Sequence, residues 1–206
     1  MIFETIVVGP LAVNCFIIGC EKTRKAAVID PGAEMDKIIN TLSRKNLTLT
    51  YILLTHGHVD HVAILNKLQQ ATSAEVLMHA DDQFLFGTIS TQAMMFGLPD
   101  PGNPKPDRFV TDGETLKFGE IVMKVIHTPG HSPGSVTYQI EDNLIVGDLI
   151  FAGSIGRTDL PGGNYETLID SVKSKIFTFP DETKIFPGHG PATTVGNEKR
   201  FNPFFS

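Results

Sequence analysis

Residues 55–61 read Thr55-His56-Gly57-His58-Val59-Asp60-His61. They follow an apolar run, residues 51–54, that is typical of a buried strand, so this histidine cluster lies on the loop leaving the strand. Gly57 allows a sharp turn, and His56 and His58 point the same way in an extended segment. Asp60 and His61 lie on the turn into the next helix and can face a second direction. Because imidazole and carboxylate suit zinc, iron or manganese, the stretch predicts metal binding with two ligand groups.

Three further candidate ligands follow predicted strands in the second half of the chain. His131 follows the strand at 121–127, Asp148 ends the strand at 143–147, and His189 follows the strand at 183–186. Glycines flank each of the three, which allows close backbone approach on a loop. We expect ligands from different strands to converge at one edge of the sheets.

Length, charge and cysteine content narrow the class of protein. The 206 residues suffice for one α/β domain with a real core. A net charge of −6 argues against nucleic acid as a partner. The N-terminus lacks a signal-peptide pattern and no apolar run reaches the ~20 residues of a membrane span, so we expect a cytoplasmic protein without membrane contact. Cys15 and Cys20 lie on opposite faces of one strand and predict free thiols, not a disulfide.

The order of predicted elements indicates two sheets packed face to face with helices outside. The predicted strands are residues 3–8, 13–18, 26–29, 47–55, 75–78, 109–111, 115–118, 121–127, 135–140, 143–147 and 183–186. The predicted helices are residues 34–45, 62–71, 79–86, 165–176 and 193–199. Residues 87–108, rich in proline and glycine, are expected to be irregular, with Met94-Met95-Phe96 either packing that segment down or lining a pocket.

Taken together, the four motifs resemble those of the metallo-β-lactamase superfamily. They are His-x-His-x-Asp-His, the histidine after Thr-Pro-Gly, the Gly-Asp pair and Pro-Gly-His-Gly, and with Asp30 they span most of the chain. The resemblance implies an α/β fold, an αββα sandwich of two mixed β-sheets flanked by helices, with a dinuclear metal site. It implies a first metal held by His56, His58 and His131, a second held by Asp60, His61 and His189, and Asp148 as the bridge.

Within the superfamily the chain is most similar to short glyoxalase II-like hydrolases. It would form a single domain, residues 1–206, without the helical C-terminal extension of full glyoxalase II, because only 17 residues (206 − 189) follow His189. The resemblance implies hydrolysis of a thioester, S-D-lactoylglutathione to D-lactate and glutathione, by a metal-bound hydroxide with Asp60 and Asp148 as catalytic residues. Two divalent cations are expected, zinc first, with iron or manganese as alternatives. The candidate substrate-binding residues are Arg157, Lys199 and Arg200.

Several alternatives remain open at the level of the sequence. The segment Gly156-Arg157-Thr158-Asp159 also resembles a loop of the iron-dependent persulfide dioxygenases, and Arg157 and Asp159 could equally form a turn closed by their own ion pair. Another metal-dependent hydrolysis, including that of nucleic acid, is a further alternative, although the acidic charge counts against nucleic acid. A metal-holding scaffold would require a closed site, whereas a loop-built rim is open. The expected partner is a small-molecule thioester, and the expected assembly is a monomer or a small homo-oligomer.

Overall fold

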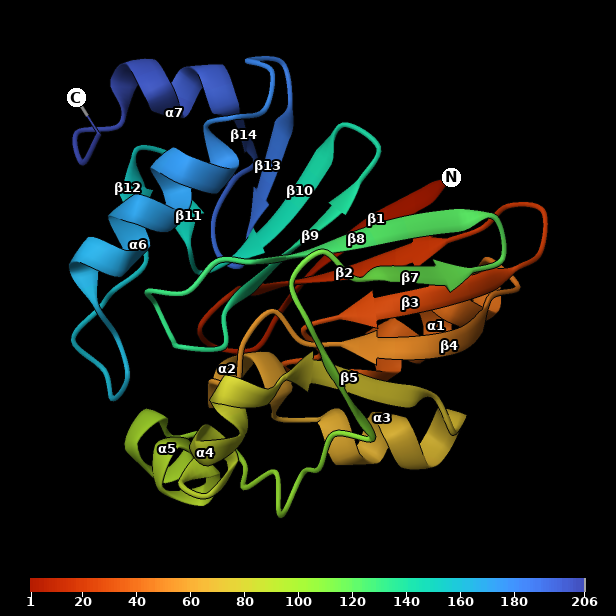
Figure 1. The fold of residues 1–206 in the computed structure, drawn as a ribbon. Helices are drawn as coiled ribbons and strands as arrows, with labels where there is room; N and C mark the ends of the chain where they lie inside the picture. Colours follow the sequence, from red (N-terminus) through yellow and green to blue (C-terminus); the bar gives the residue numbers. More distant parts are fainter. Residues whose placement is uncertain (206) are drawn as a thin grey trace.

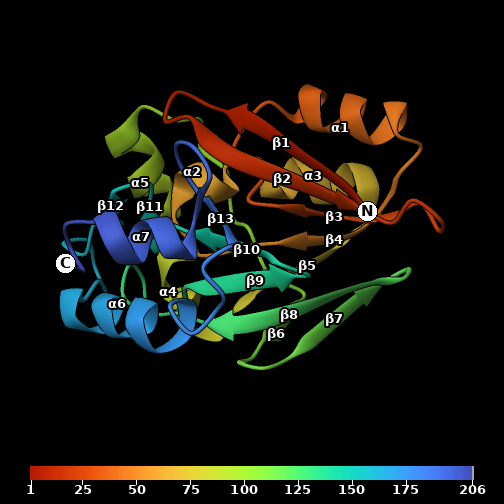
Figure 2. The ribbon, with the colours of Figure 1, turned by 90° about the horizontal axis from the view of Figure 1, so that it is seen from above.

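The structure is a computed structural model that describes residues 1–205. Within these residues the strands form two six-stranded sheets, which lie face to face with helices on their outer sides (Figure 1, Figure 2). The predicted sandwich of two mixed sheets flanked by helices is therefore confirmed. A separate two-stranded hairpin, β11 (Ile150–Phe151) and β12 (Ser154–Ile155), follows the second sheet's central strand.

The first sheet has its strands in sequence order, from β1 to β6. The antiparallel part consists of β1 (Ile2–Val8), β2 (Val13–Gly19) and β3 (Lys25–Ile29). The parallel part continues from β3 through β4 (Thr48–Leu53), β5 (Glu75–His79) and β6 (Arg108–Val110). Parallel strands need long crossover connections, and α1 (Met35–Arg44) and α3 (Leu65–Thr72) supply two of these on the outer face of the sheet (Figure 2).

The second sheet has the strand order β14-β13-β10-β9-β8-β7. Its strands are β7 (Thr115–Phe118), β8 (Ile121–His127), β9 (Val136–Ile140), β10 (Asn143–Gly147), β13 (Lys184–Pro187) and β14 (Thr193–Thr194). Only β10 and β13 pair in parallel. The connection between them contains α6 (Tyr165–Ser171), which continues in a π-helical turn at Val172–Ile176. This connection and α7 (Val195–Phe201) pack against the outer face.

Alternating side chains of the strands divide the core into layers. On β2, Cys15 and Ile17 pack toward the helices of the first sheet, whereas Phe16 and Ile18 pack between the two sheets. Cys20 joins the layer between the sheets, and both cysteines are free thiols, so the prediction of opposite faces without a disulfide is confirmed. Successive side chains of β2 point to opposite faces of the sheet, and both faces are covered. Every residue of β2 is therefore buried.

Two local predictions differ from the structure. The predicted helix at 62–71 is interrupted, because α2 (Val59–Val62) ends before Ile64, which leaves helical geometry and donates its N–H to the Pro31 carbonyl oxygen. The segment expected to be irregular contains α5 (Ile89–Phe96), which follows α4 (Gln83–Phe86). Its eight residues contain neither proline nor glycine, and Gly97 ends the helix with a φ of 63°, a conformation that glycine adopts freely.

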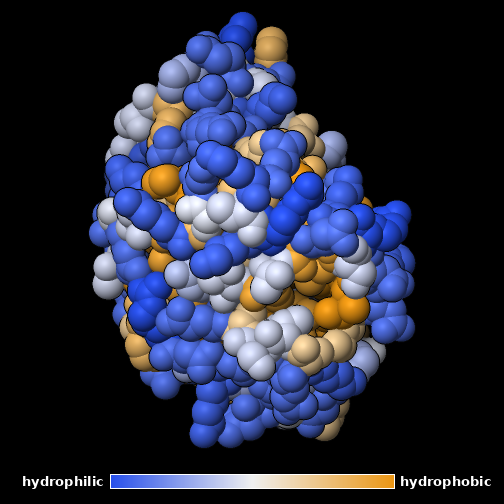
Figure 3. Space-filling view, turned by 90° about the vertical axis from the view of Figure 1, so that its right-hand side faces the viewer, coloured by the Kyte–Doolittle hydropathy of each residue, from blue (hydrophilic) through white to orange (hydrophobic). Residues whose placement is uncertain are grey.

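None of the described helices is both long and apolar enough to span a membrane. Figure 3 shows one face of the molecule, largely hydrophilic, with hydrophobic residues gathered in a hollow. Exposed large hydrophobic side chains also occur on α5, where Met94 and Met95 are 82% and 73% exposed.

Candidate metal centre

The first group of predicted ligands, His56, His58 and His131, is buried at the end of the strands. His56 and His58 lie on the loop after β4, and His131 lies on the loop between β8 and β9. Nε2 of His131 lies 3.2 Å from Nε2 of His56 and 2.9 Å from Nδ1 of His58. Three ring nitrogens from two sheets therefore face one point.

The second group of predicted ligands, Asp60, His61 and His189, lies beside the first. Nε2 of His61 lies 3.3 Å from Nε2 of His189, and Oδ2 of Asp60 lies 3.4 Å from the same His189 atom. Asp60 and His61 belong to α2, and His189 follows β13. Both side chains of this helix thus point to the same place as His189.

Asp148 contacts both groups from the end of β10. Its Oδ1 lies 3.4 Å from His61 Nε2, and its Oδ2 lies 3.5 Å from His189 Nε2 and 3.7 Å from His131 Nε2. A Cβ placed on Gly188 would collide with Asp148 Oδ1, so only glycine lets the β13 loop come this close. The structure thus brings all seven predicted ligand side chains together.

The outer ring nitrogens are fixed by hydrogen bonds that determine which nitrogen faces inward. Nδ1 of His131 donates to the Arg157 carbonyl oxygen at 2.8 Å, and Nδ1 of His189 donates to the Leu11 carbonyl oxygen at 2.9 Å. Since these acceptors have no proton to give, each histidine carries a proton on Nδ1 and directs Nε2 toward the centre.

Asp30 fixes two more imidazoles in the same way. Its carboxylate accepts hydrogen bonds from Nδ1 of His61 at 3.0 Å and from the Thr55 hydroxyl at 2.6 Å. With its proton given to Asp30, the Thr55 oxygen accepts from Nδ1 of His56 at 3.0 Å. His56 and His61 therefore also direct Nε2 inward.

This arrangement fits divalent cations. The inward Nε2 atoms of His56 and His131 lie 3.2 Å apart, and two nitrogens on a tetrahedral zinc are about 3.3 Å apart. The buried Oδ1 of Asp148 has no hydrogen-bond partner in the described chain, and the positive neighbour of this oxygen is the His61 ring at 3.4 Å, whose proton a cation would replace. Outer hydrogen bonds to carboxylate and carbonyl oxygens are the usual support of metal-binding histidines.

Comparison with known proteins agrees with this geometry. Residues 8–189 match the family described as the metallo-beta-lactamase superfamily. The chain belongs to the metallo-beta-lactamase superfamily. It is 40% identical to the hydroxyacylglutathione hydrolase GloC of Haemophilus influenzae, over all of this chain and 99% of that one.

Two solved structures of superfamily members share the fold over almost their whole length. One, described as the BLEG-1 B3 metallo-beta-lactamase, has a TM-score of 0.91 at 35% identity and covers 100% of both chains. The other, TTHA1623 in a di-iron-bound form, has a TM-score of 0.89 at 37% identity and covers 98% of this chain and 99% of that one. Members of the superfamily are generally metal-dependent hydrolases, and the cluster found here is able to hold a dinuclear site.

The two ligand groups differ in proton affinity. Burial and the neighbouring His131 lower the pKa of His58 to about 3, and burial together with His61 lowers the pKa of His56 well below its ordinary value. Burial also acts to lower the pKa of His61, but Asp60 and Asp148 outweigh it and raise that pKa to about 9. The same carboxylates overcome burial at His189 and raise its pKa to about 10. A cation entering the second group must therefore displace protons.

The centre lies at the bottom of a cleft of about 240 Å³. Beside ligand side chains, the cleft is lined by Leu11, Phe96, Arg157 and Leu160. Arg157 thus lines the cleft, but its guanidinium is engaged by Asp159, with Nε–Oδ1 at 2.7 Å and a second contact at 2.8 Å. The structure therefore shows the ion pair between Arg157 and Asp159 that was one of the two alternatives for this turn.

The other two candidate substrate-binding residues lie away from the cleft lining. Lys199 and Arg200 belong to α7, where both contact Asp181, at 3.1 Å and 3.5 Å. Neither side chain is brought to the metal centre. The positive charges of Lys199 and Arg200 are therefore paired with the carboxylate of Asp181.

Two buried carboxylates that support the site were not among the predicted site residues. Asp30 has a recognisable signal, because it is an acid directly after a buried strand and before Pro31-Gly32. Asp82 has no recognisable signal in the sequence, because its hydrogen-bond partners are distant from it along the chain. It accepts hydrogen bonds from the N–H groups of Gly57 and Gly134 and from the Ser132 hydroxyl, and so ties the loop of His58 to the loop of His131.

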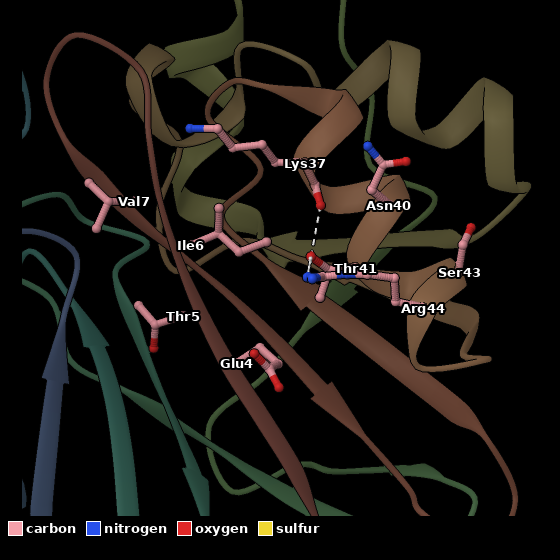
Figure 4. A pocket seen from close by; sticks show the side chains of 9 residues that line it. All are labelled: Glu4, Thr5, Ile6, Val7, Lys37, Asn40, Thr41, Ser43 and Arg44. Carbon is pink, nitrogen blue, oxygen red and sulfur yellow. Dashed lines mark hydrogen bonds between the residues drawn. The ribbon is translucent and has the colours of Figure 1, made fainter.

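A larger hollow of about 750 Å³ lies between β1 and α1 (Figure 4). Among the described residues that line it there is no histidine or cysteine. Thr41 donates to the Lys37 carbonyl oxygen and accepts from Arg44, so part of its polar lining is already paired. The chemistry of the side chains, not the size of the hollow, therefore selects the cleft as the candidate active site.

Proposed function

We propose that this chain is a metal-dependent thioester hydrolase, with S-D-lactoylglutathione as its first candidate substrate and D-lactate and glutathione as products. The observation that carries the proposal is the convergence of inward ring nitrogens and carboxylates at the bottom of the cleft. The seven proposed metal ligands are His56, His58, Asp60, His61, His131, Asp148 and His189. The name of the GloC relative supports the choice of substrate.

The proposed chemistry assigns distinct roles to the chain's own residues. Two divalent cations, zinc first and iron or manganese as alternatives, would supply Lewis acidity and water activation when bound. Asp148 would link the two ligand groups, and Asp60, 17% exposed at the cleft, would orient the attacking water. A thiolate is a good leaving group, so no separate general acid is required. Leu11, Phe96 and Leu160 would shield the reacting carbonyl from bulk water.

A persulfide dioxygenase with one iron is the alternative. The loop at 156–159 that suggested it does reach the site, since Arg157 lines the cleft. In that reaction a single iron would be held by part of the set, and Asp60, His61 and His189 would act from outside the coordination sphere. Oxygen uptake with glutathione persulfide separates the two activities. For either reaction we propose a cytoplasmic monomer or small homo-oligomer acting on a small molecule.

The test is hydrolysis of S-D-lactoylglutathione by zinc-loaded and chelator-stripped protein. We expect turnover only in the loaded protein, and we expect Asp148→Ala to lose at least one metal and most of the activity. Asp170→Ala, which removes an exposed carboxylate on α6, is the matched control and should behave as the wild type. Absence of hydrolysis of any thioester by protein that holds two metals would overturn the proposal.

A further inference from the structure

An apolar chamber of about 270 Å³ lies next to the metal cleft. Its walls include Leu85, Met95, Phe96, Leu160 and Pro161. They come from α4, α5 and the loop before α6, and in Figure 1 this loop descends toward α5 at the lower left. The chamber therefore lies between two segments that are far apart in the sequence.

The chamber adjoins the metal cleft. His58, Phe96 and Leu160 line both the chamber and the metal cleft. A molecule whose reacting atom lies in the cleft would reach the chamber by passing Phe96 and Leu160. An occupant of the chamber would therefore lie against the substrate or be part of it.

The lining of the chamber decides which arm of a thioester fits. Apart from His58, which we assign to the metal, its described walls carry no ionisable side chain. The amide of Gln92 is already engaged, because it accepts from the Val59 N–H and donates to the Leu85 carbonyl oxygen. Glutathione carries carboxylates and an ammonium group, and burying unpaired charges costs several kcal/mol. The chamber therefore suits the acyl group of a thioester better than its charged thiol carrier.

Resting on the proposed thioesterase function, we propose that this chamber binds an apolar acyl chain, so that thioesters with medium-length unbranched acyl groups are better substrates than those with short ones. Met95 and Phe96 provide the adaptable wall, since they are 73% and 40% exposed. Each methylene transferred from water to such a wall improves binding about fourfold at most.

The chain offers a matched pair of variants for the test. Met94 and Met95 are neighbours on α5 and both are strongly exposed, but only Met95 lines the chamber. The same substitution at either position has the same effect on net charge and a similar one on helix propensity. Met95→Glu places a charge in the chamber wall, whereas Met94→Glu places it outside.

The first experiment compares S-acetyl-, S-butanoyl- and S-hexanoylglutathione with zinc-loaded protein. In the wild type and in Met94→Glu we expect kcat/KM to rise at least about tenfold from acetyl to hexanoyl. In Met95→Glu we expect the increase with chain length to disappear, so that the ratio of the hexanoyl to the acetyl kcat/KM falls to about one. An equal preference for hexanoyl in both variants would overturn the proposal, as would a wild type that favours acetyl.

A binding experiment tests the acyl chamber even if the protein hydrolyses no thioester. S-Hexylglutathione and S-methylglutathione are thioethers that cannot be hydrolysed, and calorimetry gives their affinities for the zinc-loaded chain. We expect the hexyl compound to bind at least about tenfold more tightly, with the advantage lost only in Met95→Glu. Equal affinities would overturn the acyl-chamber assignment. Tight hexyl binding without any thioester hydrolysis would instead overturn the proposed function alone.

Discussion

At the scale of single residues, Asp30 links the fold to the chemistry of the site. Its buried carboxylate accepts from the Thr55 N–H at 2.8 Å, from the Thr55 hydroxyl and from His61. Through Thr55 it also fixes His56, so one side chain orients one imidazole of each ligand group. Asp30 has a φ of 55°, a left-handed conformation that Asp and Asn tolerate better than most residues.

Asp30→Asn therefore tests hydrogen bonding and charge without a change in backbone preference. An amide has one accepting oxygen, so at least one of the three buried donors loses its acceptor, which costs about 1–3 kcal/mol in the free energy of unfolding. We expect urea denaturation of the metal-free variant to show this loss. We also expect zinc affinity, measured by chelator competition, to fall about 10–100-fold. Asp170→Asn is the control, and equal zinc affinity of the two variants would contradict the role of Asp30.

At the scale of elements, the hairpin after Asp148 is held by the C-terminal helix. Glu198 on α7 is fully buried and accepts from the Gly153 N–H of the β11–β12 turn at 2.9 Å and from the Thr193 hydroxyl at 2.6 Å. The side-chain amide of Asn202 donates to Glu198 at 2.8 Å and to the Ser154 carbonyl oxygen at 2.9 Å. The short helix near the C-terminus thus fixes the segment between Asp148 and Arg157.

Glu198→Gln should remove a pH-dependent part of the stability. Burial alone would raise the pKa of the Glu198 carboxyl, but hydrogen bonds from Thr193, Asn197 and Gly153 lower it below its ordinary value of 4.5. A lowered pKa in the folded state means that the stabilisation is complete above pH 4.5 and is lost as the pH falls below it.

We expect metal-free wild type to exceed Glu198→Gln in the free energy of unfolding by about 1–3 kcal/mol at pH 7, with the difference shrinking below pH 4.5. Denaturant unfolding at several pH values measures it. The exposed Glu182 provides the control, since Glu182→Gln removes the same charge nearby. A difference that is constant from pH 7 to pH 3 would contradict the assignment.

Some helices and strands can be predicted from sequence patterns and others cannot. The strands of both sheets are predictable because apolar residues recur along them and turns separate them. The hairpin β11–β12 has two residues in each strand, too few for any period to appear. Helix α5 is missed because the prolines that follow it, from Pro99 onward, dominate the composition of its neighbourhood, although Gly97 marks its end.

At the scale of the whole molecule, the site exists because two sheets end at the same place. The order of ligand motifs in the sequence predicts which residues meet, since each motif follows a strand. It does not predict Asp82, whose partners Gly57 and Ser132 come from loops of different sheets. The pocket wall that was one alternative for Met94-Met95-Phe96 is present at Met95 and Phe96, but the sequence does not predict that the loop before α6 supplies Leu160 and Pro161 to the same chamber. The assignment of residues 1–206 to a single domain remains a prediction.

The most direct test of the account is an anomalous difference map from crystals of the zinc-loaded protein. The account predicts two peaks about 3.5–4 Å apart, the spacing of known two-metal sites. One peak should lie among His56, His58 and His131, the other among Asp60, His61 and His189, with Asp148 between them. A single peak, or a peak outside these two groups, would contradict the dinuclear centre on which the proposed hydrolysis depends.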